Sequence, residues 1–341
     1  MSAALACLLA VALVGCGGSD KESAAQDNGK ASAPAGDSGK QLKVAILLPG
    51  SVADKGYNTA AQRAGDLIRD QVGAKVTLAQ SVSVPNQADV YRQFAAQGYD
   101  LVIGWGGQFT DGAVSVSQEF PDVKFLLLAG VEGNGKNLAS LDTDIEDWEF
   151  LGGFVTAKLS KSGKIGFVGG QCFPSTAATL HGVEQGARYA NPNIKILSTF
   201  TGDFEDPTKA QQAAQAMIDD GADAMTANLN NGWFGLIKAA QNNGKIPLVT
   251  EWFDNRELAP DVIASSIQKS QAKFVVKVAQ SVKDGTFKAK HYQYSLPADW
   301  GPVMAKNPLL PDKIYQEALD VQKKIVSGEI KPKHETSCPN Q

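Results

Sequence analysis

The sequence predicts an α/β protein with two lobes, each built on a parallel sheet. From residue 42 onward, short apolar runs alternate with stretches of helical period, which is the pattern of repeated βα units. About 300 residues follow the N-terminal segment, more than a single hydrophobic core usually holds. The pattern Gly-x-Asp also occurs twice between a predicted helix and the next predicted strand, at residues 98–100 and 221–223.

The predicted elements alternate along the chain. Apolar runs predict strands at residues 44–48, 75–79, 101–104, 123–128, 165–168, 194–200, 224–227 and 247–250. Helical periodicity predicts helices at residues 60–70, 87–97, 111–119, 150–159, 177–190, 207–220, 233–242 and 271–283. Ligands of open parallel sheets bind beyond the carboxyl ends of the strands. We therefore expect a ligand cleft between the lobes, lined by the loops that follow the strands.

The N-terminus predicts an exported, lipid-anchored protein. Residues 1–12 are almost continuously apolar, and Leu13-Val14-Gly15-Cys16 is a lipobox-like ending. So short a run cannot span a hydrocarbon layer of about 30 Å, so we interpret residues 1–15 as a signal peptide and Cys16 as the lipidated N-terminus. An N-terminal helix of a soluble protein is the alternative. Residues 16–40 lack large apolar side chains and predict a flexible tether to the membrane.

Composition and motifs argue against several classes of protein. The formal net charge is −4 and no basic cluster is interleaved with aromatics, so nucleic acid is not an expected partner. The sequence contains no CxxC pair and no His/Cys cluster, so a metal site is not expected. Phosphate-binding, nucleophile-elbow and HExxH motifs are also missing, and no cofactor is expected. In an oxidising compartment, Cys172 and Cys338 could form a disulfide.

Four loops after predicted strands carry the candidate binding residues. They are residues 54–58, 104–109, 228–234 and 251–255, with residues 169–176 a weaker fifth. Amides offer donors and acceptors, and rings offer flat apolar faces, so these loops suit a planar solute with hydrogen-bonding edges. Helix capping by Asp54 or Asn58 is the alternative for the first loop, and core packing is the alternative for each aromatic. The candidates are Asp54, Tyr57, Asn58, Trp105, Gly106, Phe109, Asn228, Trp233, Trp252 and Asp254.

Residues 44–58 resemble the strand, turn and D-K-[SG]-[FY]-N element that opens the basic membrane protein family. These lipoprotein receptors feed nucleosides to bacterial ABC importers. Further similar blocks lie at residues 119–125, 150–170, 191–196, 202–210, 221–225 and 257–270. The resemblance implies a type I periplasmic-binding-protein fold, with two Rossmann-like lobes joined by a multi-strand hinge. We expect one lobe from residues 41–142 plus 258–285 and the other from residues 143–257 plus 286–337.

The resemblance also implies roles for individual residues. Asp54 and Asn58 correspond to polar contacts, Tyr57 to the family's aromatic, and Phe109 or Trp105 to a stacking surface. Lys269 is similar to the family's basic residue near the sugar. Family members that bind ribose usually have G-x-D-x-D-Q in the fourth loop, where this sequence has Trp252 in place of the first aspartate and retains Asp254 and Asn255.

This replacement favours a purine-type nucleobase over a nucleoside. A carboxylate accepts charge-assisted hydrogen bonds from sugar hydroxyls, whereas an indole adds stacking area instead. The first hypothesis is therefore a monomeric solute-binding lipoprotein that delivers a heterocycle to an ABC permease and its ATPase. A ligand sensor for a signalling partner is the second hypothesis. The third is an α/β enzyme that would act on a small heterocycle through Asp54, Glu251 or Asp254.

Overall fold

The computed structural model describes residues 41–128, 131–269, 271–296 and 301–339. The predicted signal peptide, the tether and Cys16 lie outside the described residues. No helix in the described part of the chain is long and apolar enough to cross a membrane.

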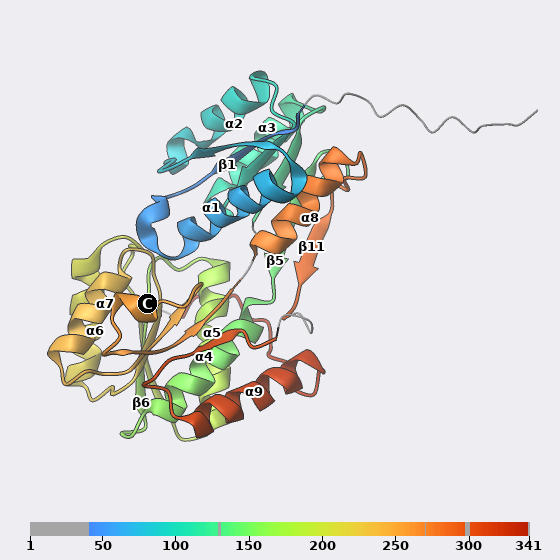
Figure 1. The fold of residues 1–341 in the computed structure, drawn as a ribbon. Coiled ribbons are helices and arrows are strands. Elements are labelled where there is room, and N and C mark those ends of the chain that lie inside the picture. The colour runs from blue at the N-terminus through green and yellow to red at the C-terminus, as the bar shows by residue number, and fades with distance from the viewer. Residues whose placement is uncertain (1–40, 129–130, 270, 297–300, 340–341) are drawn as a thin grey trace, which may run out of the picture. The chain divides into compact units, whose positions relative to one another are not determined.

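The first sheet has six strands, all paired in parallel, in the order β11-β5-β4-β3-β1-β2 (Figure 1). Successive side chains of a strand point to opposite faces. Val44 and Ile46 therefore pack with the first and last helices of this lobe, and Ala45 and Leu47 with the two between. Both faces are covered, which explains why β1 reads as a continuous apolar run. The strands are β1 (Lys43–Leu47), β2 (Lys75–Ala79), β3 (Leu101–Gly104), β4 (Lys124–Leu127), β5 (Leu138–Thr143) and β11 (His291–Tyr294). The helices are α1 (Tyr57–Leu67), α2 (Gln87–Ala96), α3 (Thr110–Glu119) and α8 (Ala272–Lys283).

The second sheet also has six strands, in the order β12-β10-β9-β8-β6-β7, and only β12 runs antiparallel to its neighbour among these pairs. Two helices cover one face and three cover the other. The strands are β6 (Lys164–Gly169), β7 (Lys195–Phe200), β8 (Met225–Asn228), β9 (Leu248–Glu251), β10 (Ile263–Ile267) and β12 (Met304–Lys306). The helices are α6 (Pro207–Asp219) and α7 (Trp233–Asn242) on the first face, and α4 (Ile145–Leu159), α5 (Pro174–Ala190) and α9 (Asp312–Val326) on the second.

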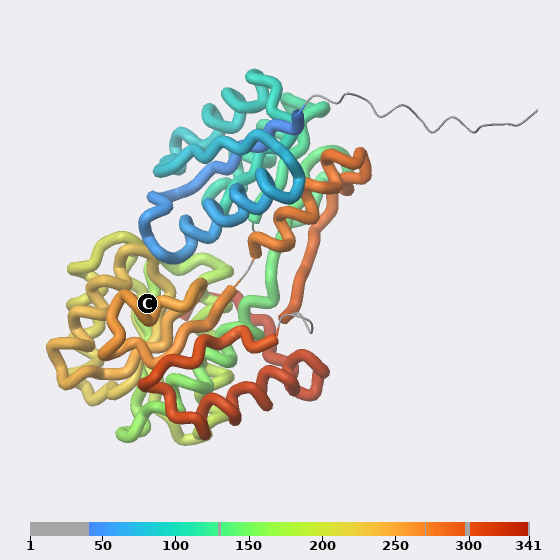
Figure 2. Tube along the Cα trace, in the orientation of Figure 1, coloured from blue at the N-terminus to red at the C-terminus, as the bar shows by residue number. Residues whose placement is uncertain are grey.

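Among the elements of the described residues, the chain passes between the two sheets three times (Figure 2): from β5 to α4, from β10 to α8, and from β11 to β12. These passages correct the expected lobe boundaries. β10 lies in the second sheet although residues 258–285 were expected in the first lobe, and β11 lies in the first sheet although residues 286–337 were expected in the second. Polar residues hide both strands in the sequence. Ser265 of β10, for example, is fully buried, and its hydroxyl is satisfied by donating to the Ala305 carbonyl (2.9 Å).

The C-terminal segment after α9 packs along α5. Cys172 and Cys338 form a disulfide, which confirms that hypothesis. Gln185 on α5 both donates to the Lys333 carbonyl (2.9 Å) and accepts from the Lys333 amide (2.7 Å). The ring of His181 also bonds the Ser337 carbonyl (2.9 Å). The segment is therefore fixed by a covalent bond and by backbone contacts with one helix.

Candidate ligand-binding site

Asp54 caps the helix that follows the first strand. It ends the short helix η1 (Val52–Asp54), and its two carboxylate oxygens accept from the backbone amides of Gly56, Asn58 and Thr59 at 2.8–3.0 Å. The Thr59 hydroxyl and the Asn58 amide donate to the same carboxylate (both 2.8 Å). These contacts satisfy the free N–H groups at the start of α1. The capping alternative thus describes the contacts that Asp54 makes in the structure.

Asn58 holds the loop after β1 in place and is fully buried. Its carbonyl oxygen accepts from the Gly50 amide (3.1 Å), and its nitrogen donates to Asp54. A Cβ atom on Gly50 would lie 2.7 Å from the Asn58 nitrogen and 3.1 Å from a carboxylate oxygen of Glu205. Glu205 belongs to the second lobe and accepts from the side chains of Asn230 and Asn231 (2.6 and 2.7 Å). The two lobes therefore meet closely at Gly50.

Three of the predicted aromatic residues form a cluster where the lobes meet. The Tyr57 ring lies 6.0 Å from the Trp105 ring and 5.2 Å from the Trp252 ring, the second pair edge to face. Trp105 is fully buried and Trp252 is 4% exposed. The Trp105 indole nitrogen has no hydrogen-bond partner among the described residues. Burial, and second the charge of Asp142, raises the pKa of the Tyr57 hydroxyl, which stays neutral. Gly106, also a predicted binding residue, adopts a positive φ of 124°, and a Cβ atom there would lie 3.0 Å from the Tyr57 hydroxyl oxygen.

Trp252 directly follows β9 of the second sheet, but its side chain packs into the core of the first lobe. The Lys269 ammonium lies 4.8 Å from the centre of its ring, a cation–π contact. At the next residue, the centre of the Phe253 ring lies 3.7 Å from the guanidinium carbon of Arg63 on α1. The loop after β9 therefore reaches across to the first lobe with two rings in succession.

A buried charge cluster lies beside the rings. The Lys269 ammonium contacts the carboxylates of Glu149 and Glu251, and all three side chains are 3–4% exposed. Asn228 donates to the other oxygen of Glu251 (3.1 Å). Burial raises the pKa of Glu251 even though Lys269 opposes the shift. Burial alone would disfavour the ammonium, but the two carboxylates raise the pKa of Lys269.

Sequence reasoning missed Glu149, which lies on α4. A usable signal was present, because this glutamate immediately precedes the apolar run FLGGFV at residues 150–155. A carboxylate that is buried together with such a run needs a positively charged partner, but the sequence does not indicate which residue that partner is.

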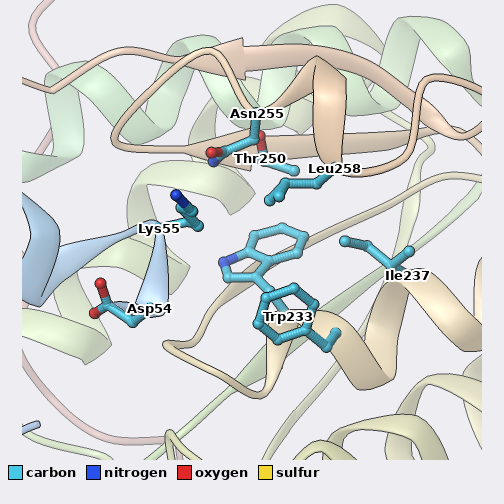
Figure 3. A pocket seen from close by; sticks show the side chains of 8 residues that line it. Asp54, Lys55, Trp233, Ile237, Thr250, Asn255 and Leu258 are labelled. Atoms are coloured by element: carbon cyan, nitrogen blue, oxygen red, sulfur yellow. The ribbon is translucent and has the colours of Figure 1, made fainter. Parts of the chain in front are cut away.

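Trp233 lines a separate small pocket that also involves both lobes. The pocket encloses only about 10 Å³, which is room for about one water molecule. In Figure 3 the Trp233 ring lies between Lys55, from the first lobe, and Ile237 of α7. The lining residues are Asp54, Lys55, Trp233, Phe234, Ile237, Thr250, Asn255 and Leu258.

Besides Trp233, two further predicted residues lie away from the aromatic cluster. Phe109 is fully buried on the face of the first sheet that α2 and α3 cover, in the core with Tyr91 and Phe125. Core packing, the alternative stated for each aromatic, thus describes its position. Asp254 is exposed, and its carboxylate accepts from the backbone amide of Arg256 (3.1 Å). In the described part of the chain, no group of three or more His, Cys, Asp or Glu side chains could hold a metal ion.

Comparison with known proteins identifies the family. Residues 41–336 match the family model of ABC transporter substrate-binding proteins described as PnrA-like. The chain belongs to this family. Basic membrane protein A2 of Borrelia garinii subsp. bavariensis is 30% identical over 298 residues, which is 84% of this chain and 87% of that protein. A purine-binding protein of Brucella abortus is 26% identical over 297 residues, covering 86% of this chain and 83% of that one.

Solved structures share the fold. An ABC transporter solute-binding protein from Conexibacter woesei is 28% identical with a TM-score of 0.69, over 86% of this chain and 99% of the other. One from Aeropyrum pernix is 20% identical with a TM-score of 0.77, over 87% of this chain and 94% of the other. The predicted family and the type I fold are confirmed. Since the family consists of substrate-binding proteins, the enzyme hypothesis does not hold.

Proposed function

We propose that this protein captures a purine-type nucleobase between its lobes and delivers it to an ABC permease. The observation that carries the proposal is the cluster of Tyr57, Trp105 and Trp252 at the junction of the lobes. Aromatic rings in edge-to-face and stacked arrangements contribute about 0.5–1.5 kcal/mol per pair beyond their burial. A planar heterocycle is the ligand that gains most from a site built for aromatic rings. The similarity to a protein named as purine-binding supports the same class of ligand.

Polar groups around the rings fit the edges of a base. The Trp105 indole nitrogen is a donor without a partner among the described residues, whereas Asn228 and Glu251 are already bonded to each other. A buried donor left without a partner costs roughly 1–3 kcal/mol, so a ligand that accepts from it would gain affinity. Lys269 is already engaged by two carboxylates. We therefore place nucleobases ahead of nucleosides, since the ammonium is not free to bind sugar hydroxyls.

We further propose that the protein works at the outer face of the membrane as a lipidated monomer. Cys16 would carry the acyl chains and residues 16–40 would act as the tether. Closure of the lobes about the three chain passages would present a surface that the permease recognises. A Cys16→Ser variant should lose membrane association in cell fractionation while its ligand affinity stays the same.

Calorimetry with the purified full chain tests the ligand class. Hypoxanthine, adenine and uric acid should bind more tightly than inosine and adenosine. The reverse order would contradict the preference for bases, and no binding by any purine would contradict the ligand class.

A pair of variants tests the site. Trp105→Phe should lower the affinity for the base several-fold, because it removes ring area and the indole donor. Tyr91→Phe is the matched control, since Tyr91 is buried on the opposite face of the same sheet, and it should leave the affinity unchanged. Uptake of a labelled base, measured in cells with and without the gene, then separates import from sensing.

A further inference from the structure

The backbone at Trp252 is strained. Its φ is +75°, a value that is unfavourable for a bulky side chain. The Phe253 amide donates to the Glu251 carbonyl two residues back (3.0 Å). Positive φ together with an i to i+2 hydrogen bond describes the rarer, strained form of the γ-turn. The Asn255 side chain donates to the same carbonyl (3.0 Å) and holds the turn. Strain of this kind persists where the surroundings hold it, and it often marks a functional segment.

The strained turn sends the indole into the first lobe. The Trp252 ring lies edge to face with Tyr57, beneath the Lys269 ammonium, and is 4% exposed. Its Cδ1 atom is 3.6 Å from the point where a Cβ of Gly56 would lie. The backbone strain at Trp252 thus accompanies the placement of its ring among residues that belong mainly to the first lobe.

The environment of this ring is the one expected around a bound heterocycle. An indole is a fused five- and six-membered ring, the same skeleton as a purine. A phenol edge on one side and a cation over the face are contacts that bind flat aromatic ligands. Since Trp105 is fully buried and Trp252 almost so, the cluster is already filled, and a second bicyclic ring cannot enter it without displacing the first.

We propose that Trp252 is a gate whose indole occupies the ring site of the unliganded protein and leaves it when the ligand binds. Leaving relieves the strain at φ +75°, which offsets part of the lost packing. The inference rests on the proposed function for the identity of the ligand, and on the geometry of the turn for the existence of the site.

Replacement by glycine tests the gate directly. Trp252→Gly removes the ring, and glycine adopts a positive φ without strain. Free indole should then bind the variant, with a raised melting temperature and a measurable affinity by calorimetry, and should not bind the unmodified protein. Purine affinity should rise at least tenfold, because the internal competitor is gone. Phe253→Ala, which removes the neighbouring ring, is the control and should gain no indole binding.

The outcomes separate this inference from the proposed function. If the variant binds purines more weakly than the unmodified protein and takes up no indole, Trp252 is a wall of the site and the gate is wrong. If the variant binds indole but neither form binds purines, the gate stands and the assigned ligand class is wrong.

A measurement on the unmodified protein covers the case in which the variant does not fold. Fluorine NMR of protein labelled with 5-fluorotryptophan should show the Trp252 signal, assigned through Trp252→Phe, moving to a solvent-exposed position when hypoxanthine or the tightest-binding purine is added. The signal of Trp148, which is 2% exposed in the core of the second lobe, should not move. A Trp252 signal that stays in place at saturation would overturn the gate.

Discussion

The ammonium of Lys269 contacts the carboxylate of Glu251 inside the protein, where the side chains are only 4% and 3% exposed. Lys269 lies two residues after β10, at a passage between the lobes, and its second partner Glu149 lies on α4. Removing charges from water costs several kcal/mol per ion, so such a cluster persists only when each charge keeps its partners.

Lys269→Met should therefore lower the free energy of unfolding by about 3–5 kcal/mol, because two carboxylates would stay buried without their cation. Urea unfolding measures this loss. Lys323→Met is the matched control, since Lys323 pairs with Asp320 where the side chains are 77% and 66% exposed, and it should cost less than about 1 kcal/mol. Equal losses in the two variants would contradict the structural role of Lys269.

Asp147 should make stability depend on pH. Burial, and second the charge of Asp144, raises the pKa of Asp147 from 3.8 to about 6. Between these values the folded protein holds a proton that the unfolded chain has released, so this contribution to stability is present at low pH and is lost as the pH rises to about 6.

Unfolding free energies measured from pH 4 to pH 8 check this. Asp147→Asn should remove part of the decline between pH 4 and 6, and above pH 7 the two curves should run parallel. Curves that stay parallel over the whole range would show that Asp147 titrates alike in both states.

Gly50→Ala should destabilise the protein, because the added Cβ would lie 2.7 Å from the side-chain nitrogen of Asn58. Asn58 is fully buried and bonded at both ends, so it cannot easily move aside. We expect a loss of about 1–3 kcal/mol, as for other overpacked sites. Gly152→Ala on α4 is the control, since its nearest neighbour would be 3.4 Å away, and alanine favours a helix by roughly 0.5–1 kcal/mol. Thermal and urea unfolding of both variants would reveal whether Gly50 tolerates a side chain.

Reduction of the disulfide should destabilise the fold. Cys172 and Cys338 are 166 residues apart, and the chain-entropy model gives a contribution of about 5 kcal/mol for a loop of this size, with about 2–4 kcal/mol typical in practice. Alkylation before reduction should leave both cysteines unmodified. The double variant Cys172→Ser, Cys338→Ser should unfold alike with and without reductant, whereas a reductant effect in that variant would point to another cause.

Most of the fold could be predicted because the central strands are apolar on both faces. All eight predicted strands are present, with ends within two residues of those expected. The missed strands lie where the chain passes between lobes or at the sheet edges. There, polar residues such as Ser265 and Gln293 break the apolar pattern, and their partners come from distant parts of the chain.

The candidate site could be predicted in part. Tyr57, Trp105 and Trp252 follow strands in the sequence and meet in the structure. Phe109 satisfies the same rule but faces the opposite side of its sheet, since a loop position alone does not fix the direction of a side chain. The pairing of Glu149 with Lys269 was out of reach, because it joins residues far apart in the chain whose contact depends on the packing of α4 against the second sheet.

The three passages between the sheets have a consequence for synthesis. Strand β11 completes the edge of the first sheet, yet it follows ten strands along the chain, and β12 closes the other sheet later still. A growing polypeptide therefore cannot finish either half before almost its whole length has been made. Truncated chains that end before residue 291 should leave the edge of β5 unpaired and aggregate. Neither lobe can therefore be expressed alone from one continuous segment of the sequence.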